Sequence, residues 1–109
     1  TNSMKENAEL DKIDDGVLGI LAEITDLLVR KNIEYANDDL YKNFREAGQL
    51  MNLKIEGVIW MYVMKHIISV KNHISGEIVL PRELLCEKIK DIICYFVLML
   101  MYVEADKNE

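Results

Sequence analysis

Two carboxylates and a tyrosine are spaced four residues apart in the stretch EKIKDIICY, at Glu87, Asp91 and Tyr95. On a helix, each step of four residues rotates the side chain by only about 40°, so all three point roughly the same way. Carboxylates one turn apart can chelate Mg²⁺ or Mn²⁺, which prefer oxygen ligands. The same carboxylates could instead form the solvated start of a helix and pair with Lys88 or Lys90. The spacing therefore leaves metal binding and a simple polar helix start both open.

A second group of charged side chains lies in the stretch KNIEYANDD, which contains Lys31, Glu34, Tyr35 and Asp38. This stretch closes a helical pattern and enters a loop rich in acidic residues. Loops that carry such groups beside a rigid helix are common places for function. The other interpretation is a polar helix end with a cation near its C-terminus.

A third group follows helical spacing in YVMKHIISVKNH, where Tyr62, His66, Ser69 and His73 share one face. His66 lies among apolar neighbours, which is typical of a core histidine with one satisfied hydrogen bond. It could also act as a hydrogen-bond donor or proton shuttle beside a phosphate. Lys65 is adjacent in sequence but lies about 100° away around the helix.

Four segments have the apolar spacing of amphipathic helices, and these must position the three groups. Gly48 suggests that the second segment ends or bends there, and Pro81 fits the first turn of the fourth. The run EIVL, residues 77–80, is a short strand-like stretch in the longest connection. The pattern predicts an all-α fold, a bundle of four to five helices. The predicted segments are residues 10–32, 39–51, 53–71 and 81–104.

The 109 residues predict one domain, residues 4–109, preceded by a cloning remnant at residues 1–3. A net charge of −6 argues against nonspecific binding to nucleic acid. The longest uncharged run, residues 92–103, has 12 residues, whereas a membrane span needs roughly 20. This run is apolar on every side, so we expect neighbours on every side and an obligate oligomer, most simply a dimer.

Cysteine usage predicts the compartment. If Cys86 and Cys94 lie on one helix, their separation of about 12 Å is too long for a disulfide. No histidine or cysteine at metal-binding spacing accompanies them. They are therefore expected to be ordinary thiols in a reducing cytoplasm.

The order of the three groups resembles the nucleotide-modification-associated domain family of phage and bacterial proteins. That family is similar in turn to the all-α nucleoside triphosphate pyrophosphatases of the MazG and dimeric dUTPase type. The resemblance covers residues 20–103, and order and spacing carry it more than any single motif. The matching positions are Lys31, Glu34, Tyr35, Asn43, Phe44, Lys65, His66, Glu87, Asp91 and Tyr95.

The chain departs from the family pattern in four respects. Glu34 stands where an aspartate is usual, and Ala36 stands where a glycine is expected. MazG-type enzymes also carry a paired Glu-x-x-Glu, which we do not find, and a Glu-x-x-Asp, which is widened here to Glu87-x-x-x-Asp91. The site could therefore be a distinct metal site, or one that has kept ligand binding and lost hydrolysis.

The resemblance implies Mg²⁺- or Mn²⁺-dependent hydrolysis of a nucleoside triphosphate between its α- and β-phosphates. Two alternatives stay open: a non-catalytic nucleotide-binding protein, such as one that sequesters a signal nucleotide in a phage–host conflict, and a structural helical oligomer without a ligand. The expected metal ligands are Glu34, Asp38, Glu87 and Asp91. The expected catalytic residues are Lys31, Lys65 and His66. The expected substrate-binding residues are Tyr35, Asn43 and Tyr95.

Overall fold

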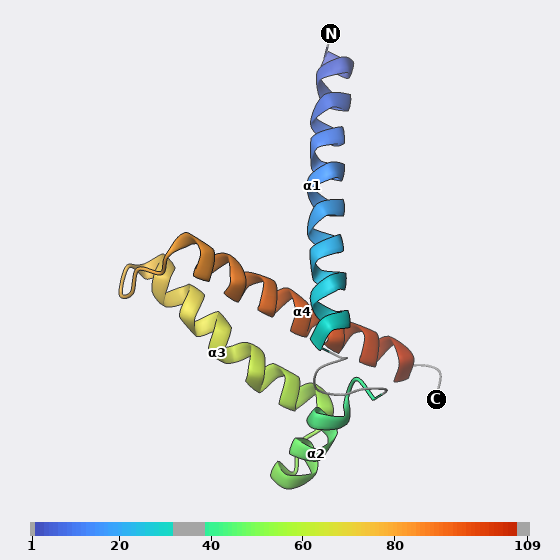
Figure 1. Ribbon diagram of the computed structural model, residues 1–109, viewed down its shortest axis with the longest axis vertical. Helices are drawn as coiled ribbons and strands as arrows, with labels where there is room; N and C mark the ends of the chain where they lie inside the picture. Colours follow the sequence, from blue (N-terminus) through green and yellow to red (C-terminus); the bar gives the residue numbers. More distant parts are fainter. Residues whose placement is uncertain (1, 32–38, 107–109) are drawn as a thin grey trace.

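The computed structural model describes residues 2–31 and 39–106, and in these ranges every regular element is a helix (Figure 1). The all-α prediction is therefore confirmed. The strand-like run at residues 77–80 forms no strand; it is part of a tight connection between two helices. None of these helices has the length and apolarity needed to cross a membrane. The four helices are α1 (Asn2–Lys31), α2 (Lys42–Met51), α3 (Ile55–Ser75) and α4 (Arg82–Asp106).

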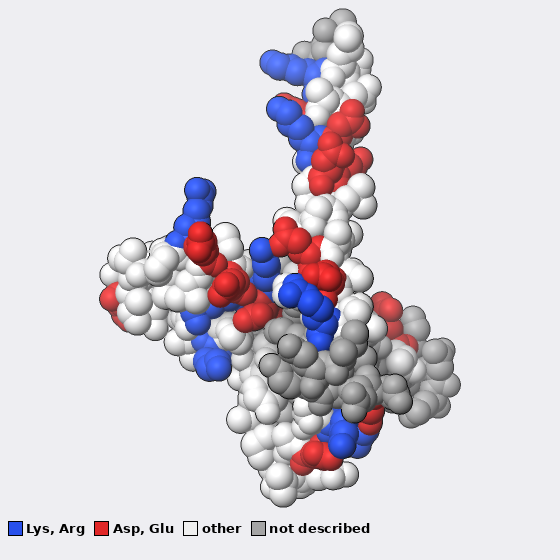
Figure 2. Space-filling view, viewed as in Figure 1, with Lys and Arg blue, Asp and Glu red and all other residues white. Residues whose placement is uncertain are grey.

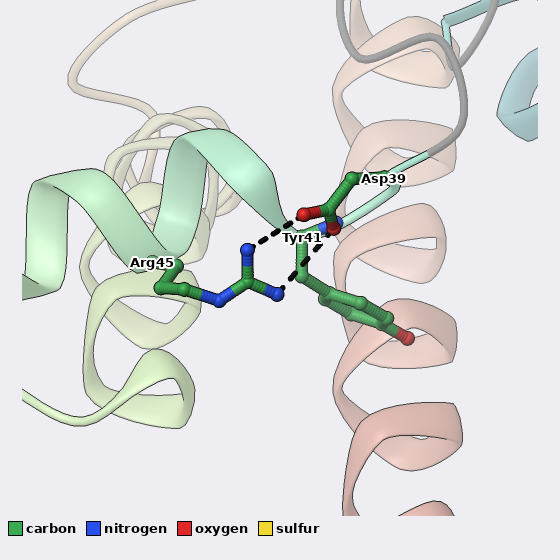
Figure 3. Close-up of polar contacts among 3 residues, drawn as sticks. All are labelled: Asp39, Tyr41 and Arg45. Atoms are coloured by element: carbon green, nitrogen blue, oxygen red, sulfur yellow. Dashed lines mark hydrogen bonds and ion pairs between the residues drawn. The ribbon is translucent and has the colours of Figure 1, made fainter.

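The start of α2 is held by a carboxylate outside the helix (Figure 3). Asp39 accepts a hydrogen bond from the backbone N–H of Tyr41 at 3.1 Å, and its carboxylate pairs with Arg45 at 2.6 Å. The Tyr41 ring points toward α4, where its hydroxyl donates to the carbonyl of Leu98 at 2.9 Å. Burial raises the pKa of the Tyr41 phenol, which favours this neutral, donating form. These contacts attach the entry of α2 to the C-terminal half of α4.

The end of α2 corrects the prediction for Gly48. The helix continues through Gly48 to Met51, and its C-cap, Asn52, has a left-handed backbone conformation with φ 57°. The chain then turns back over the helix, and the N–H of Leu53 donates to the carbonyl of Gly48 at 2.9 Å. A Cβ on residue 48 would lie 2.6 Å from the carbonyl oxygen of Leu53. Glycine is needed here for close approach of the backbone, not to stop the helix.

The helices α3 and α4 form an antiparallel hairpin (Figure 1). Gly76 ends α3 with φ 83°, in the left-handed region that glycine adopts readily. Two hydrogen bonds then fold the connection back onto α3. The N–H of Ile78 donates to the carbonyl of Asn72 at 3.3 Å, and the N–H of Leu80 donates to Nδ1 of His73 at 3.0 Å. These bonds explain why the strand-like run at residues 77–80 does not form a strand.

The core lies mainly between the two helices of this hairpin. Val58, Ile59 and Val63 of α3 are fully buried, and the most extensive packing between helices is that of α3 with α4. The apolar run at residues 92–103 contributes Cys94 and Leu98 to this core, while several of its other side chains stay exposed. Cys94 is buried, Cys86 is exposed, and both are free thiols, as the spacing predicted.

The first helix is the least integrated element. It projects away from the hairpin and approaches it only where its C-terminal part meets α4 (Figure 1). Of the α1 residues whose burial is described, Ile24 alone is buried, and residues 3–23 are all exposed. The arrangement is consistent with a helical bundle, although an elongated one that measures 59 × 41 × 25 Å.

Candidate functional site

A cleft of about 370 Å³ opens where the C-terminal part of α1 meets the N-terminal half of α4. Figure 2 shows acidic and basic side chains gathered at this junction. The volume lies within the usual range for small-ligand sites. The side chains that line the cleft are Glu23, Asp26, Leu27, Arg30, Glu87, Lys90 and Asp91.

Helical spacing places these side chains on facing surfaces. On α1, Glu23 and Asp26 are three residues apart and therefore share a face. On α4, Glu87 and Asp91 are four residues apart and share a face in the same way. Ile24 is only 3% exposed, so it secures α1 against α4 beside the cleft. Two acidic pairs from distant parts of the chain are thus brought to one place.

Two ion pairs organise the charges in the cleft. Lys90 Nζ of α4 lies 2.6 Å from Glu23 Oε2 of α1, so this pair connects the helices. The hydrogen bond to Glu23 raises the pKa of Lys90 and keeps the amine charged. Within α1, Arg30 pairs with Asp26 at 2.8 Å. With four carboxylates and two cations, the cleft keeps an excess of negative charge.

The partner of Lys90 argues against one alternative left open by the sequence, in which Glu87 and Asp91 form only a solvated helix start. A solvated helix start would pair Lys90 with a carboxylate of its own helix, such as Glu87. Lys90 instead reaches across to Glu23. The acidic turn of α4 therefore forms part of a junction between two helices.

Asp91 connects the cleft to the interior of the hairpin. Its Oδ2 lies 3.9 Å from Nδ1 of His66 on α3. The His66 side chain is only 13% exposed, so it is largely buried beside this carboxylate. Its ring stacks on Tyr95, with centroids 5.8 Å apart. His66, Asp91 and Tyr95, which the sequence placed in one site, are thus neighbours here.

Aromatic rings continue from His66 toward α2. Tyr95 stacks on Tyr62, with centroids 6.2 Å apart and planes inclined by 15°. Phe44 of α2 meets Tyr62 and Tyr95 edge to face, at 5.6 and 6.4 Å. We call these four side chains, His66, Tyr95, Tyr62 and Phe44, the aromatic row. Tyr62 is 44% exposed, so part of this residue lies within reach of solvent.

The remaining predicted site residues fall into two groups. Glu34, Tyr35 and Asp38 lie outside the described residues, as does the side chain of Lys31. Lys65 of α3 and Asn43 of α2 are both exposed. The structure therefore brings together four of the predicted site residues, His66 of α3 and Glu87, Asp91 and Tyr95 of α4.

Sequence reasoning missed the acidic pair on α1. Glu23-x-x-Asp26 has the spacing of the Glu-x-x-Glu motif that appeared to be absent, with aspartate at its second position. The signal that could have identified it is its place near the end of the first apolar pattern. Ile24 and Leu27 belong to this apolar pattern and need another helix to cover them. The acidic side chains beside them therefore come close to that covering helix.

The donor chemistry of the cleft fits Mg²⁺ or Mn²⁺, because carboxylate oxygens are the ligands these ions prefer. Among residues 2–31 and 39–106, no three acidic, histidine or cysteine side chains converge tightly enough to form a ready metal cage. Mg²⁺ does not require one, since it commonly uses one or two carboxylates, water and substrate phosphate oxygens. Glu87 and Asp91 would provide the carboxylates from α4, and Glu23 or Asp26 would approach from α1.

Comparison with known proteins identifies no relative. No family model matches the chain, and no curated protein or solved structure matches it. The likeness to the nucleotide-modification-associated family is therefore a resemblance of motif order alone. The features of the chain that indicate a function are the cleft and the aromatic row.

Proposed function

We propose that the protein binds a nucleoside triphosphate together with Mg²⁺ or Mn²⁺ in the cleft between α1 and α4, and hydrolyses it between the α- and β-phosphates. The observation that carries the proposal is the meeting of two acidic pairs, Glu23 with Asp26 and Glu87 with Asp91, in one cleft. The motif order that resembles MazG-type pyrophosphatases supports the same reading. The two alternatives remain a non-catalytic nucleotide binder and a structural oligomer without a ligand.

Electrostatics explains why a cation belongs to the proposal. The cleft has more carboxylates than cations, and the whole chain carries a net charge of −6. A triphosphate would be repelled from such a surface unless a divalent ion bridged the two. When bound, that ion polarises the phosphate and makes its coordinated water a better nucleophile.

The chain's own residues would position the rest of the nucleotide. A base would stack against Tyr62, the member of the aromatic row that is 44% exposed, because every base has a planar face that aromatic side chains accept. His66 would donate a hydrogen bond to phosphate near Asp91. Lys31 and Lys65 would neutralise negative charge on the phosphate oxygens, and Tyr35, Asn43 and Tyr95 would contact the substrate.

The metal site is tested by thermal unfolding with and without MgCl₂ or MnCl₂. Clustered carboxylates repel one another, so a bound cation should stabilise the fold. At a concentration 100 times its dissociation constant, the metal should add about 2.7 kcal/mol to the free energy of unfolding. In Glu87→Gln/Asp91→Asn this gain should disappear.

A matched control is Glu77→Gln/Glu104→Gln, which removes two exposed carboxylates outside the cleft. That variant should respond to metal as the wild type does. An unchanged metal response in Glu87→Gln/Asp91→Asn would refute the site.

Chromatography of nucleotides incubated with protein and metal distinguishes the three functions. Release of nucleoside monophosphate and pyrophosphate supports hydrolysis. Binding of an intact nucleotide, seen by calorimetry, indicates the non-catalytic alternative. If no nucleotide binds with or without metal, the result supports a structural oligomer without a ligand.

A further inference from the structure

An apolar stripe runs along α1 and is covered at only one end. Its residues follow the alternating three- and four-residue spacing of a coiled-coil seam. At the C-terminal end, Ile24 is buried and Leu27 is half-buried beside α4. Toward the N-terminus, the same stripe is between 48% and 59% exposed. We call this exposed part the α1 stripe; it comprises Leu10, Ile13, Val17, Ile20 and Leu21.

The exposed part of α1 lacks the support that a helix of this kind needs. Residues 3–23 are helical although every one of them is exposed. They include Gly16 and Gly19, each of which disfavours a helix by about 1 kcal/mol relative to alanine. Most helical stability in proteins comes from packing of an amphipathic face against a neighbour. The α1 stripe therefore requires a covering surface.

The exposed area of the chain is large enough for a stable interface. A compact monomer of 12.7 kDa would expose about 6,200 Å², whereas this chain exposes 8404 Å². The difference exceeds the roughly 800 Å² that each partner buries in a standard interface. The radius of gyration, 17.4 Å, likewise exceeds the value of about 13 Å for a compact chain of this length.

We propose that the α1 stripe packs against the α1 stripe of a second copy of this chain. The spacing of Leu10, Ile13, Val17 and Ile20 is three, four, three, which is the same in both directions along the helix. An identical helix therefore presents an apolar side chain at each matching position, as a two-fold symmetric interface requires. None of these four positions is charged, and Asp14, seven residues before Leu21, lies at the edge of the stripe, so the seam itself does not call for a partner of opposite charge.

Sedimentation equilibrium at micromolar concentration tests the proposal. The wild type should have twice the 12.7 kDa mass of one chain. Ile13→Asp/Ile20→Asp, which places charges in the α1 stripe, should have the mass of one chain. Met4→Asp/Leu18→Asp is the matched control, because these exposed apolar residues lie on α1 outside the stripe. It should remain a dimer.

Several outcomes would overturn the proposal. A wild-type mass of one chain would mean that another protein, or another segment of this chain, covers the α1 stripe. A dimer that persists in Ile13→Asp/Ile20→Asp would place the interface elsewhere, and a monomeric control would show a general effect of added charge. If circular dichroism shows that Ile13→Asp/Ile20→Asp does not fold, the pairing is tested on the wild type instead. Intermolecular NOEs are then measured in a mixture of labelled and unlabelled protein. Such NOEs between stripe methyl groups support the pairing, and their absence refutes it.

Discussion

At the scale of single residues, the structure separates two histidines that the sequence placed on one face of α3. His73 accepts a hydrogen bond from the N–H of Leu80 and so closes the α3–α4 connection. His66 lies beside Asp91 at the cleft and stacks on Tyr95. The two side chains share a helix and a residue type, but only His66 adjoins the candidate site. This difference allows a paired test.

We expect His66→Ala to weaken nucleotide binding by roughly 1.5–3 kcal/mol, the range for a hydrogen bond to a charged partner. Metal binding should be nearly intact, because the carboxylates remain. His73→Ala should lower the free energy of unfolding and leave nucleotide affinity unchanged. Calorimetric titration into protein shown to be folded by circular dichroism measures both. Wild-type affinity in His66→Ala would remove His66 from the site.

The Asp39 carboxylate gives a pH-dependent prediction. Its hydrogen bond from Arg45 is the main cause that lowers the pKa of Asp39 below 3.8. A carboxyl whose pKa is lower when folded stabilises the fold above its unfolded pKa, and that contribution is lost as the pH falls through the folded pKa. In Arg45→Gln, the Asp39 pKa measured by NMR should return toward 3.8. Lys42→Gln removes a weaker charge interaction and should raise the Asp39 pKa less. Equal pKa shifts in the two variants would contradict Arg45 as the main cause.

At the scale of elements, two glycines near the α2–α3 turn have opposite expectations. A Cβ at residue 48 would lie 2.6 Å from the carbonyl oxygen of Leu53, so Gly48→Ala must displace backbone. We expect it to lower the free energy of unfolding by about 1–3 kcal/mol, as overpacking does. At Gly57 the nearest contact would be an ordinary 3.8 Å. Gly57→Ala should therefore stabilise α3 by roughly 0.5–1 kcal/mol. Urea unfolding of both variants measures the difference, and equal effects would argue against the close approach.

Periodicity was sufficient to predict all four helices, because each has a continuous apolar face that a local pattern reveals. It placed the start of α1 near Leu10, whereas the helix begins at Asn2, because the residues before Leu10 lack a regular apolar spacing. It could not show that Glu23 and Lys90 would meet, since their contact depends on how two distant helices cross. The acidic turn of α4 was recognised as a candidate because its residues lie together in sequence. Its counterpart on α1 was missed because only the tertiary fold brings the two together.

At the scale of the whole molecule, stability is concentrated in the α3–α4 hairpin. The fully buried side chains, Val58, Ile59 and Val63, all belong to α3, and the largest share of packing between helices is with α4. The first helix adds Ile24 to this core and otherwise extends into solvent. Different parts of one short chain should therefore open with very different free energies.

Hydrogen exchange of the full chain at two concentrations measures that difference. Amides of Val58, Ile59 and Val63 should exchange slowly at every concentration, because the hairpin core buries them. Amides at residues 10–21 should exchange rapidly in dilute protein, where nothing covers the α1 stripe. At higher concentration a second copy would bind the folded helix and shift its opening equilibrium by mass action, so their protection should increase. If residues 10–21 are as well protected as the hairpin core in a sample shown to be monomeric, α1 is stable without a partner. Its apolar stripe would then need another explanation.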